Sequence, residues 1–442
     1  MNTTANQIII KNSVFLRTED AFINRHLKEG MTGLELEAHR IDRKGHLSQT
    51  LHPFPGNAFI DRDFGEDQME INTPPFPEIS EALNFLHEQL RTVHRALSGN
   101  GELLWPFSNP PILDGEDRIP VARYEGAQLP GYNYRLHLAE RYGKYKMTFS
   151  GIHFNYSFPE TLLKRNFMID PAGCGSFAEY RDHFYLKLAE KALAYSWACV
   201  ALLAASPLVD NSFFEAGKSG KTLFTGFSSL RCSAFGYWNQ FVPLLSYSSM
   251  REYVDSIRQY IDQGLLIKAS ELYYPVRIKP DGKYTLEALS AGGINHIELR
   301  MMDLNPMKND LVDIRDLEFL KLLLIWLAAN DMPPLAQADQ IQALENHKSA
   351  AAYDWTLAHI VLPGKRAGSL LDCLSALLAE MKTFYKNDPS AESVLAYESC
   401  KLYNKKDRYA AIVRREFESD YINQGLRRAR SIQESFNVST YS

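Results

Sequence analysis

Five short segments in which apolar and polar residues alternate lie far apart along the 442-residue chain. They cover residues 34–41, 66–73, 151–158, 271–279 and 294–303. Side chains in a strand point alternately to opposite faces, so each segment has one apolar and one polar face. Helical patterns fill the intervals between them. This order favours an α+β fold with a largely antiparallel sheet covered by helices on one face, because the strand–helix units are too irregular for a doubly wound α/β fold.

Four stretches have helical patterns, and along the chain they lie between or after the alternating segments. They are residues 77–97, 177–204, 313–331 and 390–433, the last of which becomes basic toward its end. In the first and third, acidic residues occupy the first turn, where they favour a helix start. No linker separates two halves, and all the strands are needed for one sheet. We therefore expect a single catalytic domain over residues 1–442.

The uncharged residues 192–209 are the one segment to weigh as a membrane span. They are rich in alanine and serine, include Pro207, and have no second such segment beside them, so we interpret them as part of a buried core helix. The N-terminal segment "MNTTANQIIIKNSVF" lacks the basic start and long apolar core of a signal peptide. Five scattered cysteines without CxxC spacing fit a reducing compartment. We expect a soluble cytoplasmic protein, and its net charge of −5 does not indicate nucleic acid as a partner.

Polar residues that suit catalysis lie on the polar faces of the alternating segments. In "GLELEAHR", Glu35 and Glu37 share one face, about 7 Å apart. Like charges that close repel each other, so water alone rarely accounts for such a pair. The other segments add Glu66 and Glu70 in "DFGEDQMEINTP", His153 in "SGIHFNYSF", Arg277 and Lys279 in "LYYPVRIKP", and Glu298 and Arg300 in "NHIELRMMD".

Two interpretations of this face stay open. A polar strand face is most often exposed to solvent, and a lone histidine such as His153 is most often structural. Several carboxylates in one place need cations to stay ionised, however, and the same arrangement recurs in separate segments. Carboxylate oxygens, one imidazole and nearby basic residues suit Mg²⁺ or Mn²⁺ bridging substrate phosphates. The residues therefore indicate nucleotide-dependent chemistry.

The sequence "GKSGKT" at residues 217–222 is similar to the end of a phosphate-binding P-loop. That motif requires a glycine five residues before Gly220, where this chain has Glu215. We interpret the segment as a surface turn.

Seven blocks, taken in order, resemble bacterial glutamate–cysteine ligase (γ-glutamylcysteine synthetase), both the monofunctional enzymes and the ligase domain of bifunctional glutathione synthases. The blocks are "GLELEAHRIDRKGHLSQTLHP", "DRDFGEDQMEINTP", "LLWPFSNPP", "RYGKYKMTFSGIHFNYSFP", "SLRCSAFGYWN", "ELYYPVRIK" and "GGINHIELRMMDLNP". The resemblance covers residues from about 30 to about 335 and leaves a divergent helical part from about 340 to 442. It implies a glutamine-synthetase-like fold, with a mostly antiparallel sheet shaped as a half-barrel and helices on its outer face.

The resemblance also implies the reaction. ATP phosphorylates the γ-carboxylate of glutamate, and an amine then attacks the acyl phosphate. The implied divalent-metal ligands are Glu35, Glu37, Asp63, Glu70, His153 and Glu298. Arg300 matches the basic residue on the transferred phosphoryl group, where charge accumulates, and with Glu298 and Arg231 it is expected to carry catalysis. Arg277 and Lys279 are expected beside the nucleotide, although alone they are typical of a solvated strand face.

The implied substrate-binding residues form two sets. Arg231, Tyr237 and Tyr273 match residues that hold the amino-acid substrates, and Phe64, Tyr134, Arg135 and Leu138 align with the acceptor pocket. Met147 and Phe149 replace a polar glutamine and an aliphatic residue of the family beside that pocket. A less polar wall shifts acceptor preference, because one polar contact is worth about 1–3 kcal/mol.

Three hypotheses follow. The first is an ATP-dependent γ-glutamyl ligase with L-cysteine as acceptor, and the second is the same chemistry with another amino acid or amine. The third is a non-catalytic relative that binds nucleotide, which the complete set of metal-ligand positions argues against. No ATP-grasp domain follows in this sequence, so we do not expect this chain to make glutathione itself.

Overall fold

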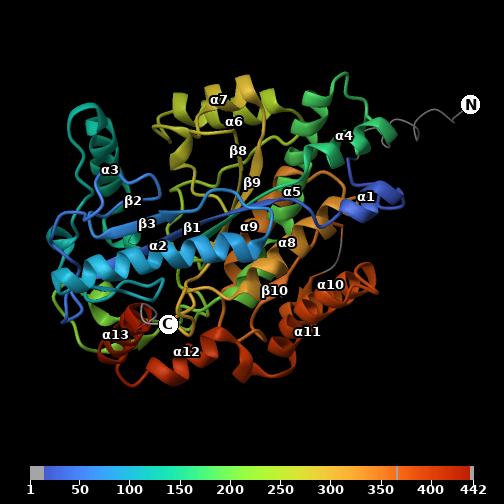
Figure 1. The fold of residues 1–442 in the computed structure, drawn as a ribbon. Coiled ribbons are helices and arrows are strands. Elements are labelled where there is room, and N and C mark those ends of the chain that lie inside the picture. Colours follow the sequence, from blue (N-terminus) through green and yellow to red (C-terminus); the bar gives the residue numbers. More distant parts are fainter. Residues whose placement is uncertain (1–13, 365–366, 439–442) are drawn as a thin grey trace, which may run out of the picture.

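The computed structural model describes residues 14–364 and 367–438. The segment for which no signal peptide is expected lies almost wholly outside the described residues. Figure 1 shows a central sheet with the helix α2 (Ile79–Asn100) running along its strands and the C-terminal helices, which begin at Leu370, below it.

A seven-stranded sheet forms the centre of the described part of the chain. Its strands follow the order β2 (Ile60–Arg62), β3 (Gln68–Asn72), β1 (Met31–Ile41), β5 (Ile152–Ser157), β9 (His296–Met302) and β8 (Val276–Lys279), and β4 (Leu103–Leu104) pairs with β1. All of these pairs are antiparallel. Each of the five alternating segments contributes a strand, so the predicted α+β fold with an antiparallel sheet is confirmed.

Helices cover the apolar face of this sheet, as expected. They include α2, α5 (Phe177–Leu203) and α8 (Ile314–Ala329), and α9 (Gln337–Ala350) packs against α5. Alternate residues such as Leu34, Leu36 and Phe154 leave the strands on this side and enter one large hydrophobic core with the helices. α5 is buried along most of its length. Its second half, from Ala192, is uncharged and apolar on all sides, and in its first half the buried Lys187 pairs with Glu190 at 2.9 Å.

The uncharged segment 192–209 therefore belongs to the core. It forms the second half of α5 and then leads into the short strand β6 (Leu208–Asp210). Among the described residues, no helix combines the length and the apolar character that a bilayer crossing requires. The turn at 217–222 connects β6 to β7 (Thr222–Phe224). Because a strand follows it where a P-loop needs a helix, the segment is not a P-loop.

The remaining elements surround this core. They are α1 (Ala21–His26), α3 (Leu129–Tyr142), α4 (Glu160–Ile169), α6 (Met250–Asp262), α7 (Leu286–Gly292), β10 (His359–Ile360), β11 (Gly368–Ser369), α10 (Leu370–Phe384), α11 (Pro389–Tyr403), α12 (Tyr409–Phe417) and α13 (Tyr421–Val438). The helical stretch expected at 390–433 thus consists of three helices. The basic α13 packs back against α2 and β4, and its Gln433 amide donates to the backbone carbonyls of His94 and Glu102.

A buried ionic cluster ties α11 to the core. The Lys401 ammonium lies 2.9 Å from Glu398 Oε2 and 3.2 Å from Asp316 Oδ1, and it also donates to the backbone carbonyl of Leu202 in α5. The Tyr409 hydroxyl of α12 donates to the same Asp316 oxygen at 2.8 Å. The three charged residues are buried, so two carboxylates share one ammonium away from water.

This cluster makes stability depend on pH. Burial raises the pKa of Glu398 to about 8, even though Lys401 acts in the opposite direction. An unfolded glutamate titrates near about 4.3, so between that pH and about 8 the folded state holds a proton that the unfolded chain has lost. Stability therefore falls as pH rises through this window. We expect Glu398→Gln, which cannot titrate, to flatten this dependence in urea unfolding measured across the window.

The exposed Glu392→Gln on the same helix serves as the matched control and should keep the wild-type dependence. Equal slopes in Glu398→Gln and wild type would contradict the assignment.

Candidate active site

The polar face of the sheet lines a cavity of about 250 Å³. Among the described residues, its wall contains most of the predicted site residues together with two others. The lining side chains are those of Glu35, Glu37, Asp63, Phe64, Glu70, Tyr134, Arg135, Leu138, Met147, His153, Tyr237, Lys268, Ser270, Tyr273, Arg277, Lys279, Glu298 and Arg300.

Strand register explains why residues far apart in sequence meet here. Glu35 lies opposite His153 across β1 and β5, and Glu298 lies opposite Asn155 on one side and Arg277 on the other. Directly opposed residues on one face have neighbouring side chains. In β1 and β3 the same rule brings Glu37 opposite Glu70. The polar residues of adjacent strands thus form one continuous row across the sheet.

The β5–β9 ladder contains one irregularity within this row. Ile152 lies opposite Met302, whereas Phe154 lies opposite Leu299, so β9 has one extra residue beside His153. A bulge of this kind increases the local twist and redirects side chains, and it often occurs next to active sites.

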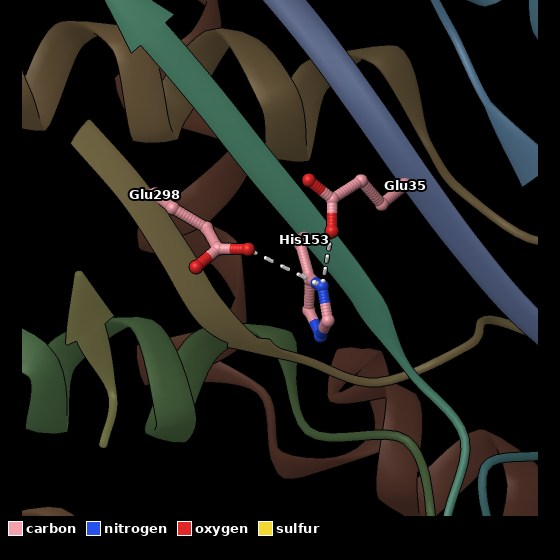
Figure 2. A group of neighbouring side chains, drawn as sticks. All are labelled: Glu35, His153 and Glu298. Carbon is pink, nitrogen blue, oxygen red and sulfur yellow. Dashed lines mark hydrogen bonds and ion pairs between the residues drawn. The ribbon is translucent and has the colours of Figure 1, made fainter. Parts of the chain in front are cut away.

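Glu35, His153 and Glu298 converge in the middle of the row, as Figure 2 shows. His153 Nδ1 lies 2.8 Å from Glu35 Oε2 and 3.7 Å from Glu298 Oε1, and its Nε2 lies 3.4 Å from Glu37 Oε1. Burial, aided by Arg300, lowers the pKa of His153 to about 4. The imidazole is therefore neutral at pH 7, the form that can bind a metal.

Basic side chains surround Glu298. Arg300 Nη1 lies 2.9 Å from Glu298 Oε1, Lys279 Nζ lies 3.4 Å from the same oxygen, and Arg277 Nη1 lies 4.0 Å from Oε2. Burial alone would raise the pKa of Glu298, but these three cations hold it well below its usual value. Lys279 also lies 3.8 Å from Glu35. Positive charge is thus concentrated at one side of the carboxylates.

At two other carboxylates, Glu37 and Glu70, burial and neighbouring negative charges outweigh the effect of nearby cations. Burial, followed by the charge of Asp63, raises the pKa of Glu37 to about 8, although Arg231 and Arg300 act in the opposite direction. Burial and Asp63, with Glu35 and Glu37, likewise raise the pKa of Glu70 well above its usual value. A bound cation would reverse this repulsion, because opposite charge favours the ionised carboxylate.

The residues present fit a divalent cation. One ligand atom from each of Glu35, His153 and Glu298 lies within 4.8 Å of the others. Two buried atoms, His153 Nε2 and Glu298 Oε2, have no hydrogen-bond partner within the described ranges, and such orphans call for an explanation. A donor set of carboxylate oxygens with one imidazole suits a hard ion such as Mg²⁺ or Mn²⁺.

Another part of the cavity wall is apolar and aromatic. Phe64, Leu138, Met147 and Tyr273 are buried in one cluster, and the Tyr134 and Tyr237 rings pack at its border. Tyr134 and Leu138 stand one turn apart on α3, which places both on the same side of that helix. The Tyr273 hydroxyl lies 4.0 Å from the Met147 sulfur. This wall suits a small apolar or thiol side chain.

Three residues singled out in the sequence do not line this cavity. The first is Glu66, whose carboxylate accepts from the backbone amides of His52 at 2.8 Å and Arg123 at 2.7 Å. The Phe149 ring is not part of the cavity wall: it packs with Val209, Leu230 and Phe213, and Phe213 and Tyr237 also border the apolar wall of the cavity. Phe149 follows the turn at Tyr145–Thr148, where the chain becomes extended, so its side chain does not continue the arrangement of the turn that carries Met147.

Arg231 lies one layer behind the site. Its guanidinium donates to the backbone carbonyl of Arg300 at 2.7 Å, and it lines a neighbouring cavity of about 40 Å³ with Tyr237 and Tyr273. Gly151 is required beside it, because a Cβ there would lie 2.5 Å from the Arg231 guanidinium carbon. Arg231 thus supports the strand that carries Arg300.

Sequence reasoning missed Lys268 and Ser270, both in the segment before β8. They lie in an irregular stretch, where no periodicity indicates which way a side chain points. Asn155, in contrast, shares the polar parity of His153, and its amide donates to Glu35 Oε1 at 3.0 Å.

Comparisons with known proteins agree with this geometry. The family model for glutamate–cysteine ligase matches residues 17–265 and 260–350. The glutathione biosynthesis bifunctional proteins of Listeria monocytogenes and Clostridium perfringens are each 30% identical to the chain, over 96% and 95% of its length. The chain spans about half the length of these curated relatives, 57% and 55% respectively.

Two solved structures share the fold. The bifunctional glutathione synthetase from Pasteurella multocida has a TM-score of 0.83 at 24% identity and covers 95% of this chain and 54% of that one. A glutamate–cysteine ligase from Francisella tularensis, solved in complex with AMP, has a TM-score of 0.83 at 20% identity and covers 94% and 90%. The resemblance in the sequence is confirmed, and the chain belongs to the glutamate–cysteine ligase family.

Proposed function

We propose that the protein is an ATP-dependent γ-glutamyl ligase that joins the γ-carboxylate of L-glutamate to the amine of L-cysteine. The observation that carries this proposal is one cavity lined by Glu35, His153 and Glu298 together with basic residues and an apolar, aromatic part of the wall. Such a cavity brings phosphate, a carboxylate and a small amino acid together. Membership of the glutamate–cysteine ligase family supports the same reaction.

Divalent cations would be held by the carboxylates and the imidazole of this row. The proposed ligands are Glu35, Glu37, Asp63, Glu70, His153 and Glu298. Mg²⁺ or Mn²⁺ bound there would neutralise ATP and orient its phosphates. Neutral His153 and the raised pKa values of Glu37 and Glu70 support this assignment, since these groups gain most from a cation.

The proposed reaction has two steps. An oxygen of the glutamate γ-carboxylate attacks the γ-phosphorus of ATP, the bond to the β-phosphate oxygen breaks, and ADP leaves. The acceptor nitrogen then attacks the γ-carbonyl carbon, phosphate leaves, and the nitrogen loses a proton to give the amide. Arg300 and Lys279 place positive charge where the transferred phosphoryl group develops negative charge.

Two other basic residues hold the backbone of the site in place through hydrogen bonds to carbonyl groups. The Arg277 guanidinium donates to the backbone carbonyls of Leu272 and Ser270, the latter at 2.9 Å, so it fixes the loop that carries Tyr273 as well as facing Glu298. Arg231 acts in the same way behind Arg300. Both are proposed as positioning residues.

A panel of acceptors tests this function. Purified protein with ATP, glutamate and Mg²⁺ is offered L-cysteine, other amino acids and simple amines, and products are identified by mass. We expect a γ-glutamyl product and stoichiometric ADP, with L-cysteine the best acceptor. Another amine ranking far above cysteine would replace the acceptor and keep the chemistry. No ADP and no product with any acceptor would favour a non-catalytic relative.

A further inference from the structure

Lys268 is a cavity residue to which neither the strand pattern nor the family resemblance assigns a role. It lies just before a short 3₁₀ turn, Ala269–Glu271, and its ammonium stands over the Tyr134 ring, 3.4 Å from the ring centroid. Tyr134 belongs to the aromatic wall, so Lys268 lies beside that wall.

The turn that carries Lys268 is fixed to α3. Buried Glu271 Oε1 lies 2.9 Å from Arg141 Nη1 and accepts from the Tyr142 hydroxyl at 3.0 Å, while Oε2 accepts from the Ile267 amide at 2.6 Å. Arg141 also donates to the backbone carbonyl of Gly264. The same helix carries Tyr134, so the ammonium and the ring are held on one rigid support.

The basic side chains that line the cavity differ in the groups that balance their positive charge. Arg300 and Lys279 face Glu298, and Arg277 faces Glu298 and backbone carbonyls. The Arg135 guanidinium donates hydrogen bonds to the backbone carbonyls of Asp63, Arg62 and Gly131. Within the described residues, the Lys268 ammonium has no carboxylate within 4.0 Å, and the Tyr134 ring is its close contact.

In the described part of the protein, the positive charge of Lys268 therefore has no close anionic partner, and an anionic group of a substrate would supply one. Partial burial of the ammonium, with Arg135 and Lys283 nearby, lowers the pKa of Lys268 to about 8, and a bound carboxylate would oppose this shift. At pH 7 the side chain still carries its charge. A lysine ammonium is a compact donor suited to a single carboxylate.

We propose that Lys268 binds the α-carboxylate of the acceptor and so makes the enzyme select an α-amino acid over an amine that lacks this group. This inference rests on the proposed γ-glutamyl ligase function. The apolar wall beside Tyr134 takes the acceptor side chain, and the amine points toward the Glu298 side, where the acyl phosphate forms. Glutamate, whose γ-carboxylate must reach Arg300, does not depend on Lys268.

The test compares amino acids with amines that differ from them only by the carboxylate. The pairs are L-cysteine with cysteamine and L-2-aminobutyrate with propylamine. We expect Lys268→Met to lower the ratio of kcat/KM between amino acid and matched amine by about tenfold or more, since bonds to charged groups are among the stronger ones. The KM of the amino-acid acceptor should rise well beyond any change in the KM of glutamate.

Two variants separate this role from a general effect. Lys268→Arg keeps the charge and should restore most of the discrimination. Lys283→Met removes a nearby exposed lysine that does not line the cavity, and it should change the ratio less than about twofold. An unchanged ratio in an active Lys268→Met enzyme, or a rise in the KM of glutamate instead, overturns the assignment. Absence of any γ-glutamyl product from the wild-type protein overturns the ligase function, and this inference with it.

Discussion

Glu37→Gln is expected to lower kcat/KM of the ligase reaction by at least about 100-fold, because even the loss of groups that only orient a metal ligand costs 10- to 100-fold. The amide keeps the size of the side chain and removes the charge that would hold a cation. Product formation under saturating ATP and Mg²⁺ measures this loss. Mn²⁺ binding followed by calorimetry provides a second readout that does not depend on turnover.

The same variant should keep the stability of the fold. Burial and Asp63 raise the pKa of Glu37 to about 8, so a neutral side chain suits its surroundings at pH 7. Glu298→Gln differs, because it would leave Arg300, Lys279 and Arg277 around a neutral group, and unpaired buried charges destabilise by several kcal/mol. The exposed Glu287→Gln on α7 is the control for charge alone. Full turnover by Glu37→Gln would show that the metal assignment is wrong.

Lys401→Met is expected to lower the free energy of unfolding by about 3–5 kcal/mol, the usual result of removing one partner of a buried ionic group. Two buried carboxylates, Glu398 and Asp316, then face each other without an ammonium. Chemical unfolding at pH 9, above the pKa of about 8 that burial gives Glu398, measures the loss. The exposed Lys406→Met, a few residues further along the chain, should change stability by less than about 0.5 kcal/mol.

A double variant sharpens this expectation. At the same pH, where Glu398 is ionised, Lys401→Met with Glu398→Gln removes opposite charges together, so its loss should be smaller than the sum of the two single losses. Additive losses would mean that Lys401 acts through packing and not through its charge.

The strand pattern predicted which residues share a face but not which of them touch. Alternation around Glu35 and Glu37 correctly placed Leu34 and Leu36 in the core and the carboxylates on the other side. The approach of His153 to Glu35 depends on strand register, which is set by turns and by burial of whole faces. The family resemblance predicted this approach indirectly, because it implied that both residues bind the same metal ions.

Irregular segments set the limit of prediction. Phe149 follows a 3₁₀ turn, where the period of two does not apply, and its ring enters another cluster. Lys268 lies in a loop whose position depends on Glu271 and Arg141, two residues far apart in sequence. The helices were predicted more accurately than these irregular segments. α2, α5 and α8 occupy nearly the predicted ranges, because a long run of apolar residues at helical spacing is not compatible with a strand or a loop.

The extra residue of β9 beside His153 matters to anyone who would graft this site onto another protein. A regular antiparallel ladder continued from Phe154 opposite Leu299 would bring Met301 opposite Ile152, where this sheet has Met302. A host sheet given only the side chains of the row would hold Glu298 and Arg300 at other angles to the imidazole. The irregularity in the ladder has to be transplanted with the residues.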